Sequence, residues 1–137
     1  MISRIELNLR YSDTDQMGVI YHANYFTYFE QGRTAYLREL GYMYHEIEEA
    51  GLLFPVRDVN CTYLKSIRFG DTVYLNTYVK DVSKIKITYG HELYNSSGDL
   101  CAKGQTSVVS VAKEDFSLSR FDQTYPKLYK KYKENIV

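Results

Sequence analysis

Hydrophobic and polar residues alternate along the first part of the chain with the period of a β-strand. Over residues 4–11, Ile5, Leu7, Leu9 and Tyr11 occupy every second position, and polar or charged residues occupy the positions between them. This alternation predicts a strand with one buried face. We therefore expect a half-buried strand near the start of the chain.

The hydrophobic period changes to three or four residues over about residues 22–40, which predicts one long helix. Gly41 follows as a C-terminal cap. Additional apolar residues widen the apolar face, so we expect the helix to lie deep against a sheet. A shorter helical pattern covers residues 42–50 and ends at Gly51. The positions of the long helix that recur at this spacing are His22, Phe26, Phe29, Arg33, Tyr36 and Leu40.

The rest of the chain is typical of strands joined by short turns. The turn sequences RFGD, DVSK and NSSGD separate the strand patterns, and short links between consecutive strands indicate an antiparallel sheet. The lysine-rich C-terminal residues 125–137 are interpreted as a surface helix or a frayed tail. The predicted strands cover residues 54–65, 72–81, 85–95 and 100–112.

The order of strand, long helix and four strands predicts the α+β class, with one antiparallel sheet wrapped around a long central helix. A chain of 137 residues has the size of one ordinary domain, so we expect residues 1–137 to form a single domain.

Composition and charge exclude several classes of partner and location. Seventeen basic residues balance seventeen acidic ones, so no global field favours nucleic acid. Charges at Arg4, Glu6 and Arg10 interrupt any signal peptide, and no apolar run of about eighteen residues exists for a membrane span. We expect a cytoplasmic protein. Cys61 and Cys101 lie far apart without nearby paired ligands, which favours ordinary buried thiols over a metal site.

The stretch YSDTDQMGVIYHANY, residues 11–25, places two acids and a glycine just before the long helix. A carboxylate at Asp15 would lie near the unpaired N–H groups of the first helical turn, which also favour a developing oxyanion. Gly18 allows the backbone to pass close to a substrate. The stretch therefore places a carboxylate, a glycine and unpaired backbone donors close together.

This stretch and the residues that follow it resemble the hot-dog fold thioesterases, specifically the branch related to 4-hydroxybenzoyl-CoA thioesterase and the YbgC-type acyl-CoA thioesterases. The similarity extends through YLKSIRFGD at residues 63–71 and the later strands. The residues that carry it are Asp13-Thr14-Asp15, Gly18-Val19, Tyr21-His22, Asn24-Tyr25, Phe29-Glu30 and Arg33.

The resemblance implies hydrolysis of an acyl-CoA thioester at a site between two subunits of a homodimer or tetramer. It implies Asp15 as the catalytic carboxylate, acting as nucleophile or general base, with backbone N–H groups near His22 polarising the carbonyl. Gly18, Val19, Tyr21 and His22 are the expected substrate-binding residues. No metal or other cofactor is expected, since coenzyme A is part of the substrate.

Several residues have a simpler structural interpretation. Asp13 is expected to form the turn and is left outside the site. His22 is an orienting group, a direct acid-base group or a histidine at a helix start. Glu30 is expected to form an ion pair with Arg33, although another branch of the hot-dog enzymes carries its catalytic carboxylate on this helix. His45 and His91 are interpreted as surface or sheet residues. Lys65 and Arg68 are candidates for binding coenzyme A phosphates, although a basic pair at a sheet edge is usually solvated.

Other functions remain open at this point. An acyl-carrier-protein thioesterase would use the same chemistry, because the same phosphopantetheine arm serves both substrates. A hydratase or dehydratase on the same fold would, by family likeness, need a proline- and glycine-rich segment near the helix, and only Pro55 and Pro126 are present. A non-catalytic acyl-CoA-binding module would bind the ligand without releasing thiol.

Overall fold

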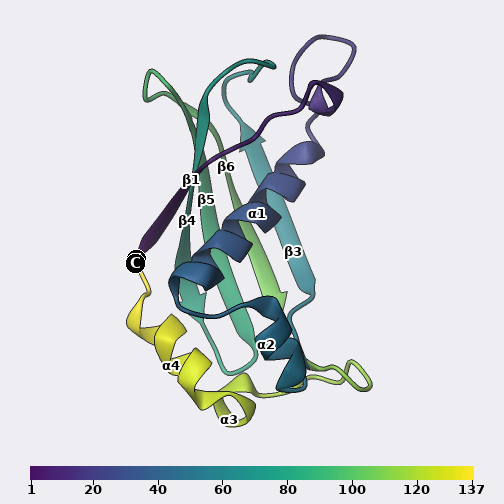
Figure 1. The fold of residues 1–137 in the computed structure, drawn as a ribbon, viewed down its shortest axis with the longest axis vertical. Helices are drawn as coiled ribbons and strands as arrows, with labels where there is room; N and C mark the ends of the chain where they lie inside the picture. The colour runs from purple at the N-terminus through teal and green to yellow at the C-terminus, as the bar shows by residue number, and fades with distance from the viewer.

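Helix α1, residues Asn24–Glu39, lies across one face of the sheet in the computed structural model, which describes residues 1–137 (Figure 1). The helix predicted at about residues 22–40 is confirmed. Its C-terminus ends as the glycine predicts, because Gly41 has a φ of +97° and donates its N–H to the carbonyl of Arg38 at 3.0 Å.

The sheet contains five antiparallel strands in the order β1-β4-β5-β6-β3. This arrangement confirms the predicted α+β fold, with one antiparallel sheet curved around a central helix (Figure 1). The strands are β1, Ile2–Glu6; β3, Val56–Tyr63; β4, Val73–Val82; β5, Lys86–Asn95; and β6, Leu100–Val109.

The sequence interpretation of neighbouring strands is wrong at one link. Strands β4, β5 and β6 form consecutive hairpins as predicted, but β3 pairs with β6 at one edge of the sheet, three strand positions away from β4. The link of residues 64–72 therefore crosses the sheet instead of turning back. Nine residues reach about 30 Å and three strand spacings measure about 14 Å, so the sequence length permits either path.

The predicted first strand is also shorter than expected. β1 ends at Glu6, and Tyr11 is 76% exposed in a 3₁₀ turn at Tyr11–Asp13. Leu7 remains buried beyond the strand, because the chain continues along the sheet and the Leu7 N–H bonds the carbonyl of Val73 at 2.9 Å. The alternating pattern therefore recorded a buried face that extends past the end of regular pairing.

The lower end of the molecule is closed by short elements that follow α1 and β6 (Figure 1). The lysine-rich C-terminus is a docked helix and not a frayed tail, since Leu128 is fully buried and the Tyr132 hydroxyl lies 2.7 Å from that of Tyr89. These elements are α2, Tyr44–Glu49; β2, Leu52–Leu53; β7, Val111–Ala112; α3, Phe121–Thr124; and α4, Pro126–Glu134.

The buried side chains form two clusters, one at each end of α1. The C-terminal cluster includes Tyr36, Leu37, Phe121, Leu128 and Tyr132. The N-terminal cluster joins the first half of α1 to residues of β4, β5 and β6 and to the loop before the helix. Its members are Leu7, Ile20, Tyr25, Tyr28, Phe29, Ile67, Val73, Leu75, Leu93, Cys101 and Ala102.

The buried face of α1 differs from the predicted stripe at His22 and Phe26, which are both exposed. Tyr25 and Tyr28 face the core instead, and the stripe residues Phe29, Arg33, Tyr36 and Leu40 are buried as predicted. No ion pair joins Glu30 to Arg33, because Arg33 is turned inward and is 7% exposed while Glu30 stays in solvent.

His91 lies in the sheet, as expected, and is enclosed between the two clusters. It is 1% exposed, its ring stacks on Phe29 at 4.3 Å, and its two ring nitrogens contact the hydroxyls of Thr77 and Thr106. No helix is long and apolar enough to cross a membrane.

Candidate active site

The loop between β1 and α1 folds back on itself and presents Asp15 at its tip. Thr14 and Ile20 form an antiparallel bridge, and the Asp15 N–H bonds the carbonyl of Val19 at 2.9 Å. Gly18 turns the chain with a φ of +80°, a conformation that suits glycine. The local sequence therefore encodes a tight loop that leads directly into the helix.

Asp13 anchors this loop to the protein interior. Its carboxylate is buried and accepts bonds from the backbone N–H of Arg10 at 3.2 Å, the Arg10 guanidinium at 2.9 Å and the Tyr28 hydroxyl at 2.9 Å. Burial by itself raises the pKa of the Asp13 carboxyl, but these hydrogen bonds and the Arg10 charge outweigh burial and hold the pKa below its usual value. Asp13 has a structural role, as the sequence predicted.

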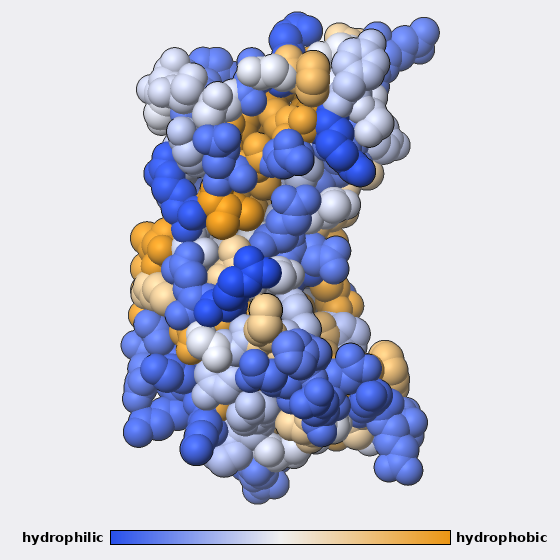
Figure 2. Space-filling view, in the orientation of Figure 1, coloured by the Kyte–Doolittle hydropathy of each residue, from blue (hydrophilic) through white to orange (hydrophobic).

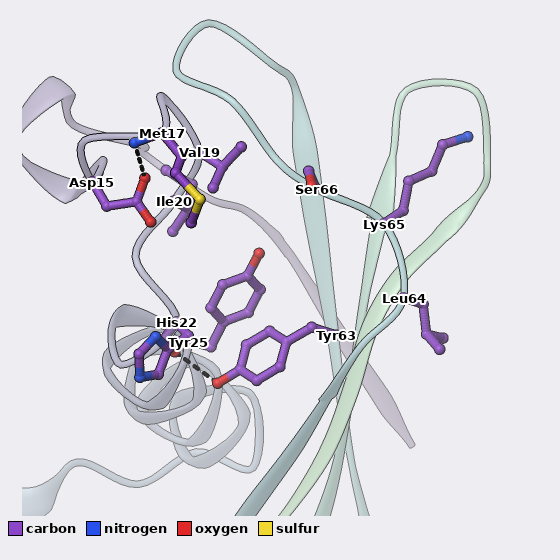
Figure 3. Close-up of a pocket in the computed structure, with 10 residues that line it drawn as sticks. All are labelled: Asp15, Met17, Val19, Ile20, His22, Tyr25, Tyr63, Leu64, Lys65 and Ser66. Atoms are coloured by element: carbon purple, nitrogen blue, oxygen red, sulfur yellow. Dashed lines mark hydrogen bonds between the residues drawn. The ribbon is translucent and has the colours of Figure 1, made fainter.

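Asp15 faces a different environment, a pocket of about 250 Å³ beside the start of α1 (Figure 3). One carboxylate oxygen, Oδ1, accepts the Met17 N–H at 2.8 Å, and the other makes no hydrogen bond within the chain. A half-buried carboxylate with one free oxygen is available to a substrate or a water molecule. The lining residues are Asp15, Met17, Val19, Ile20, His22, Tyr25, Tyr63, Leu64, Lys65 and Ser66.

The N-terminus of α1 supplies unpaired donors at the same pocket. No side chain caps the helix at Ala23, and the backbone N–H groups of His22 and Ala23 donate no hydrogen bond within the chain. His22 and Tyr25, on either side of the helix start, both line the pocket. Free N–H groups and the positive end of the helix dipole favour negative charge at this position.

The pocket contains some of the predicted substrate-binding residues. Val19 and His22 line it, whereas Gly18 and Tyr21 lie outside its lining. Tyr21 is 45% exposed, and its ring packs 4.4 Å from that of His22. Gly18 lies beside Arg68, because a Cβ added at Gly18 would lie 3.5 Å from Nη1 of Arg68.

The two predicted coenzyme A contacts differ in their surroundings. Lys65 lines the pocket, and its ammonium pairs with Asp99 at 2.7 Å on the surface. This hydrogen bond and the Asp99 charge raise the pKa of Lys65. Arg68 lies outside the pocket lining, and its guanidinium makes no hydrogen bond or ion pair within the chain.

Tyr63 is the most informative pocket residue that the sequence interpretation missed. Its hydroxyl donates to the carbonyl of His22 at 2.8 Å, and its ring packs edge-on against Tyr25 at 4.8 Å (Figure 3). The strand alternation could place Tyr63 on the inner face of β3. Only the three-dimensional structure brings the end of β3 beside the start of α1.

The chain has no group of three or more His, Cys, Asp or Glu side chains arranged to hold a metal ion. Both cysteines are free thiols, and burial raises the pKa of each. Cys101 is buried, as predicted, whereas Cys61 is only half-buried.

Comparisons with known proteins agree with this fold. Residues 17–102 match the family described as the thioesterase superfamily. YneP of Bacillus subtilis, named as a candidate acyl-CoA thioesterase, is 38% identical over 97% of this chain and 96% of its own length. The acyl-CoA thioesterase YbgC of Haemophilus influenzae is 34% identical over 64% of this chain and 65% of its own length.

A solved structure shows the same fold at similar identity. The DHNA-CoA thioesterase of Staphylococcus aureus superposes with a TM-score of 0.93 and 36% identity, covering 97% of this chain and 89% of that one. The family match spans more than half of the chain and includes most of the pocket lining. The chain therefore belongs to the thioesterase superfamily and is a thioester hydrolase.

Proposed function

We propose that this protein hydrolyses acyl-CoA thioesters to a free acid and coenzyme A, with Asp15 as the catalytic carboxylate. The observation that carries the proposal is the shared pocket: Asp15, with one free carboxylate oxygen, and His22 line one cavity. The backbone N–H groups of His22 and of the adjoining Ala23 have no partner within the chain. The named relatives support the acyl-CoA substrate class.

The chemistry follows from the two sides of this pocket. Asp15 either attacks the thioester carbon itself or removes a proton from water as the water attacks. The carbonyl oxygen becomes negative and accepts hydrogen bonds from the N–H groups of His22 and Ala23. The C–S bond then breaks, and the thiolate leaves and takes up a proton. On the nucleophilic route, water cleaves the acyl-Asp15 anhydride in a second step.

Binding of the coenzyme A portion is proposed for the rim of the pocket. Lys65 lies at this rim with more than half of its side chain exposed, so a phosphate can compete with Asp99 for its ammonium. Arg68 lies behind the Gly18 loop with a free guanidinium and is the second candidate. A carrier-protein thioester would present the same phosphopantetheine arm, so it remains an alternative substrate.

A homodimer or a larger assembly is part of the proposal. β3 is an edge strand, and its outward edge has no partner within the chain. Val56, Val59 and Tyr63 are each more than one third exposed along it. Figure 2 shows apolar side chains gathered in the upper half of the face that carries α1, with others along the edge where Figure 1 places β3. Such edges favour pairing with a second copy.

The oligomeric state can be measured by light scattering. A monomer at micromolar concentration would contradict the proposed dimer or larger assembly.

The experiment that tests the function is a thiol-release assay with acyl-CoA thioesters from acetyl to palmitoyl, together with benzoyl-CoA and DHNA-CoA. We expect hydrolysis of at least one thioester by the wild-type protein and a large loss in Asp15→Asn. Matched carrier-protein thioesters identify the preferred carrier. Binding of acyl-CoA without thiol release would instead show a non-catalytic module.

The rings in the pocket favour an aromatic acyl group as the best substrate. Tyr25, Tyr63 and His22 contribute three aromatic side chains to the lining, and flat rings pack well against such surfaces. The name of the S. aureus relative supports including DHNA-CoA in the panel. A higher kcat/KM for palmitoyl-CoA than for every aryl-CoA tested would contradict this preference.

A further inference from the structure

Tyr63, the last residue of β3, contacts the start of α1 at the pocket. Its hydroxyl donates to the carbonyl oxygen of His22 at 2.8 Å, over a sequence separation of 41 residues. Its side chain is 44% exposed, and its ring lies edge-on to the Tyr25 ring at 4.8 Å and to the His22 ring at 6.3 Å (Figure 3). These two ring contacts orient the hydroxyl.

The bonded carbonyl belongs to the same peptide group as the N–H of Ala23. That N–H is one of the two donors at the helix start that have no partner within the chain. A hydrogen bond accepted by the oxygen of a peptide group polarises the group and strengthens its N–H as a donor, by roughly 10–30% in condensed-phase estimates. The weaker contact from the Tyr25 N–H to the same oxygen, at 3.3 Å, acts in the same direction.

We propose that Tyr63 is a positioning residue that orients and polarises the His22–Ala23 peptide group, which makes the Ala23 N–H an oxyanion donor beside the His22 N–H. This inference rests on the proposed thioester hydrolysis at Asp15. It assigns to the end of β3 a role in the reaction that no local pattern around the helix supplies.

The Tyr63 hydroxyl is protonated near neutral pH. Burial, followed by the neighbouring Cys61, raises the pKa of Tyr63 to about 12. The group therefore donates to the His22 carbonyl across the working pH range, and removing it should lower the rate without shifting the pH profile.

Tyr63→Phe deletes the hydroxyl and retains the ring contact with Tyr25. We expect kcat to fall about 3- to 10-fold with KM unchanged, less than the 100- to 1,000-fold typical for removing an oxyanion donor itself. Tyr11→Phe is the matched control, because Tyr11 is 76% exposed and its hydroxyl makes no hydrogen bond. A rise in KM alone, or equal kcat values for Tyr63→Phe and wild type, would overturn the inference.

A spectroscopic measurement separates polarisation from support of the fold. The probe is a ketone analogue of the best acyl-CoA substrate, in which a methylene replaces the thioester sulfur and the carbonyl carries ¹³C. In wild type the carbonyl stretch should move to lower frequency on binding than in water, and Tyr63→Phe should reverse part of that shift. An equal shift in both proteins rejects the role of Tyr63 alone, whereas no shift in wild type rejects the oxyanion site itself.

A double-mutant cycle tests which N–H receives the effect. Ala23 has a φ of −68°, which proline can adopt, so Ala23→Pro deletes this N–H with little backbone strain at the residue itself. We expect Tyr63→Phe to lower kcat in wild type but to have no further effect in Ala23→Pro. Full additivity of the two losses would show that Tyr63 acts on another group.

Discussion

The two ends of α1 are finished in opposite ways. At the C-terminus the Gly41 turn satisfies exposed carbonyls, with Tyr42 donating to Leu37 at 3.1 Å, and the short helices α2, α3 and α4 pack around the C-terminal cluster. At the N-terminus no side chain caps the helix, two N–H groups stay unpaired, and the surrounding residues line an open pocket. One end gives stability, and the other leaves donors available for chemistry.

The same contrast appears between the two acids of the loop. Both carboxylate oxygens of Asp13 accept hydrogen bonds, from Arg10 and Tyr28, whereas Asp15 has one oxygen without a partner in the pocket. Groups whose hydrogen bonds are complete hold the fold, and incomplete ones are available to a ligand. The predictions below test this division.

The largest effect is expected for Asp15→Asn. Asparagine keeps the size and the acceptor for the Met17 N–H but removes the charge, so kcat should fall about 100- to 10,000-fold while the thermal midpoint changes little. Steady-state thiol release and thermal unfolding give the two values.

Asp13→Asn is the matched control in the same loop. It should lose less activity and more stability, because it removes the charge from a buried, fully bonded carboxylate. An inactive Asp13→Asn beside an active Asp15→Asn would reverse the assignment, and two active variants would reject a carboxylate mechanism.

The closed end should show the opposite result. Leu128 is fully buried in the C-terminal cluster, so Leu128→Ala should lower the free energy of unfolding by about 2–5 kcal/mol and leave kcat nearly unchanged. Denaturant unfolding and thiol release measure the two effects. The exposed neighbour Lys127→Ala should stay within about 0.5 kcal/mol of wild type. A kcat loss in Leu128→Ala as large as that of Asp15→Asn would show that the two ends are coupled.

The buried side chain of His91, which lies between the two clusters, predicts that the free energy of unfolding depends on pH. Burial, followed by the charge of Arg33, lowers the pKa of His91 from 6.5 to about 3. Between these values the unfolded chain binds a proton that the folded chain does not, so the free energy of unfolding should decrease as pH falls through this window, by at most about 1.4 kcal/mol per pH unit.

The pH dependence is checked by denaturant unfolding from pH 7 to pH 4.5. His91→Asn, which cannot titrate, should show a smaller slope than wild type over this range. Asp13 contributes at lower pH, because its lowered pKa gives stability that is lost as pH falls through the folded-state value. Identical slopes for wild type and His91→Asn would show that His91 is not the source.

The smallest effect is expected for chelation. The proposed chemistry uses a carboxylate and backbone donors, so incubation with EDTA followed by gel filtration should leave thiol release unchanged. Loss of activity that returns on addition of a divalent cation would reject the prediction that no metal is needed.

The sequence determined the features that depend on neighbouring residues. The long helix, its glycine cap and the acid-containing loop before it were predicted because their periods and turn chemistry act over a few positions. The same stretch carried the family motif, so the fold and thioester hydrolysis followed from it. The different roles of Asp13 and Asp15 were also predicted. The catalytic role of Asp15 is a proposal.

Only the tertiary structure decided the contacts between distant segments. It placed β3 at the edge beside β6, turned Phe26 outward, docked the lysine-rich helix α4 and brought Tyr63 to the carbonyl of His22. A local pattern shows which face of an element is buried, but it does not show which other element covers that face. That choice depends on how all the buried surfaces pack together. The length of residues 64–72 permits β3 to lie beside β4 or at the far edge beside β6, and only the packing of the whole sheet selects the second position.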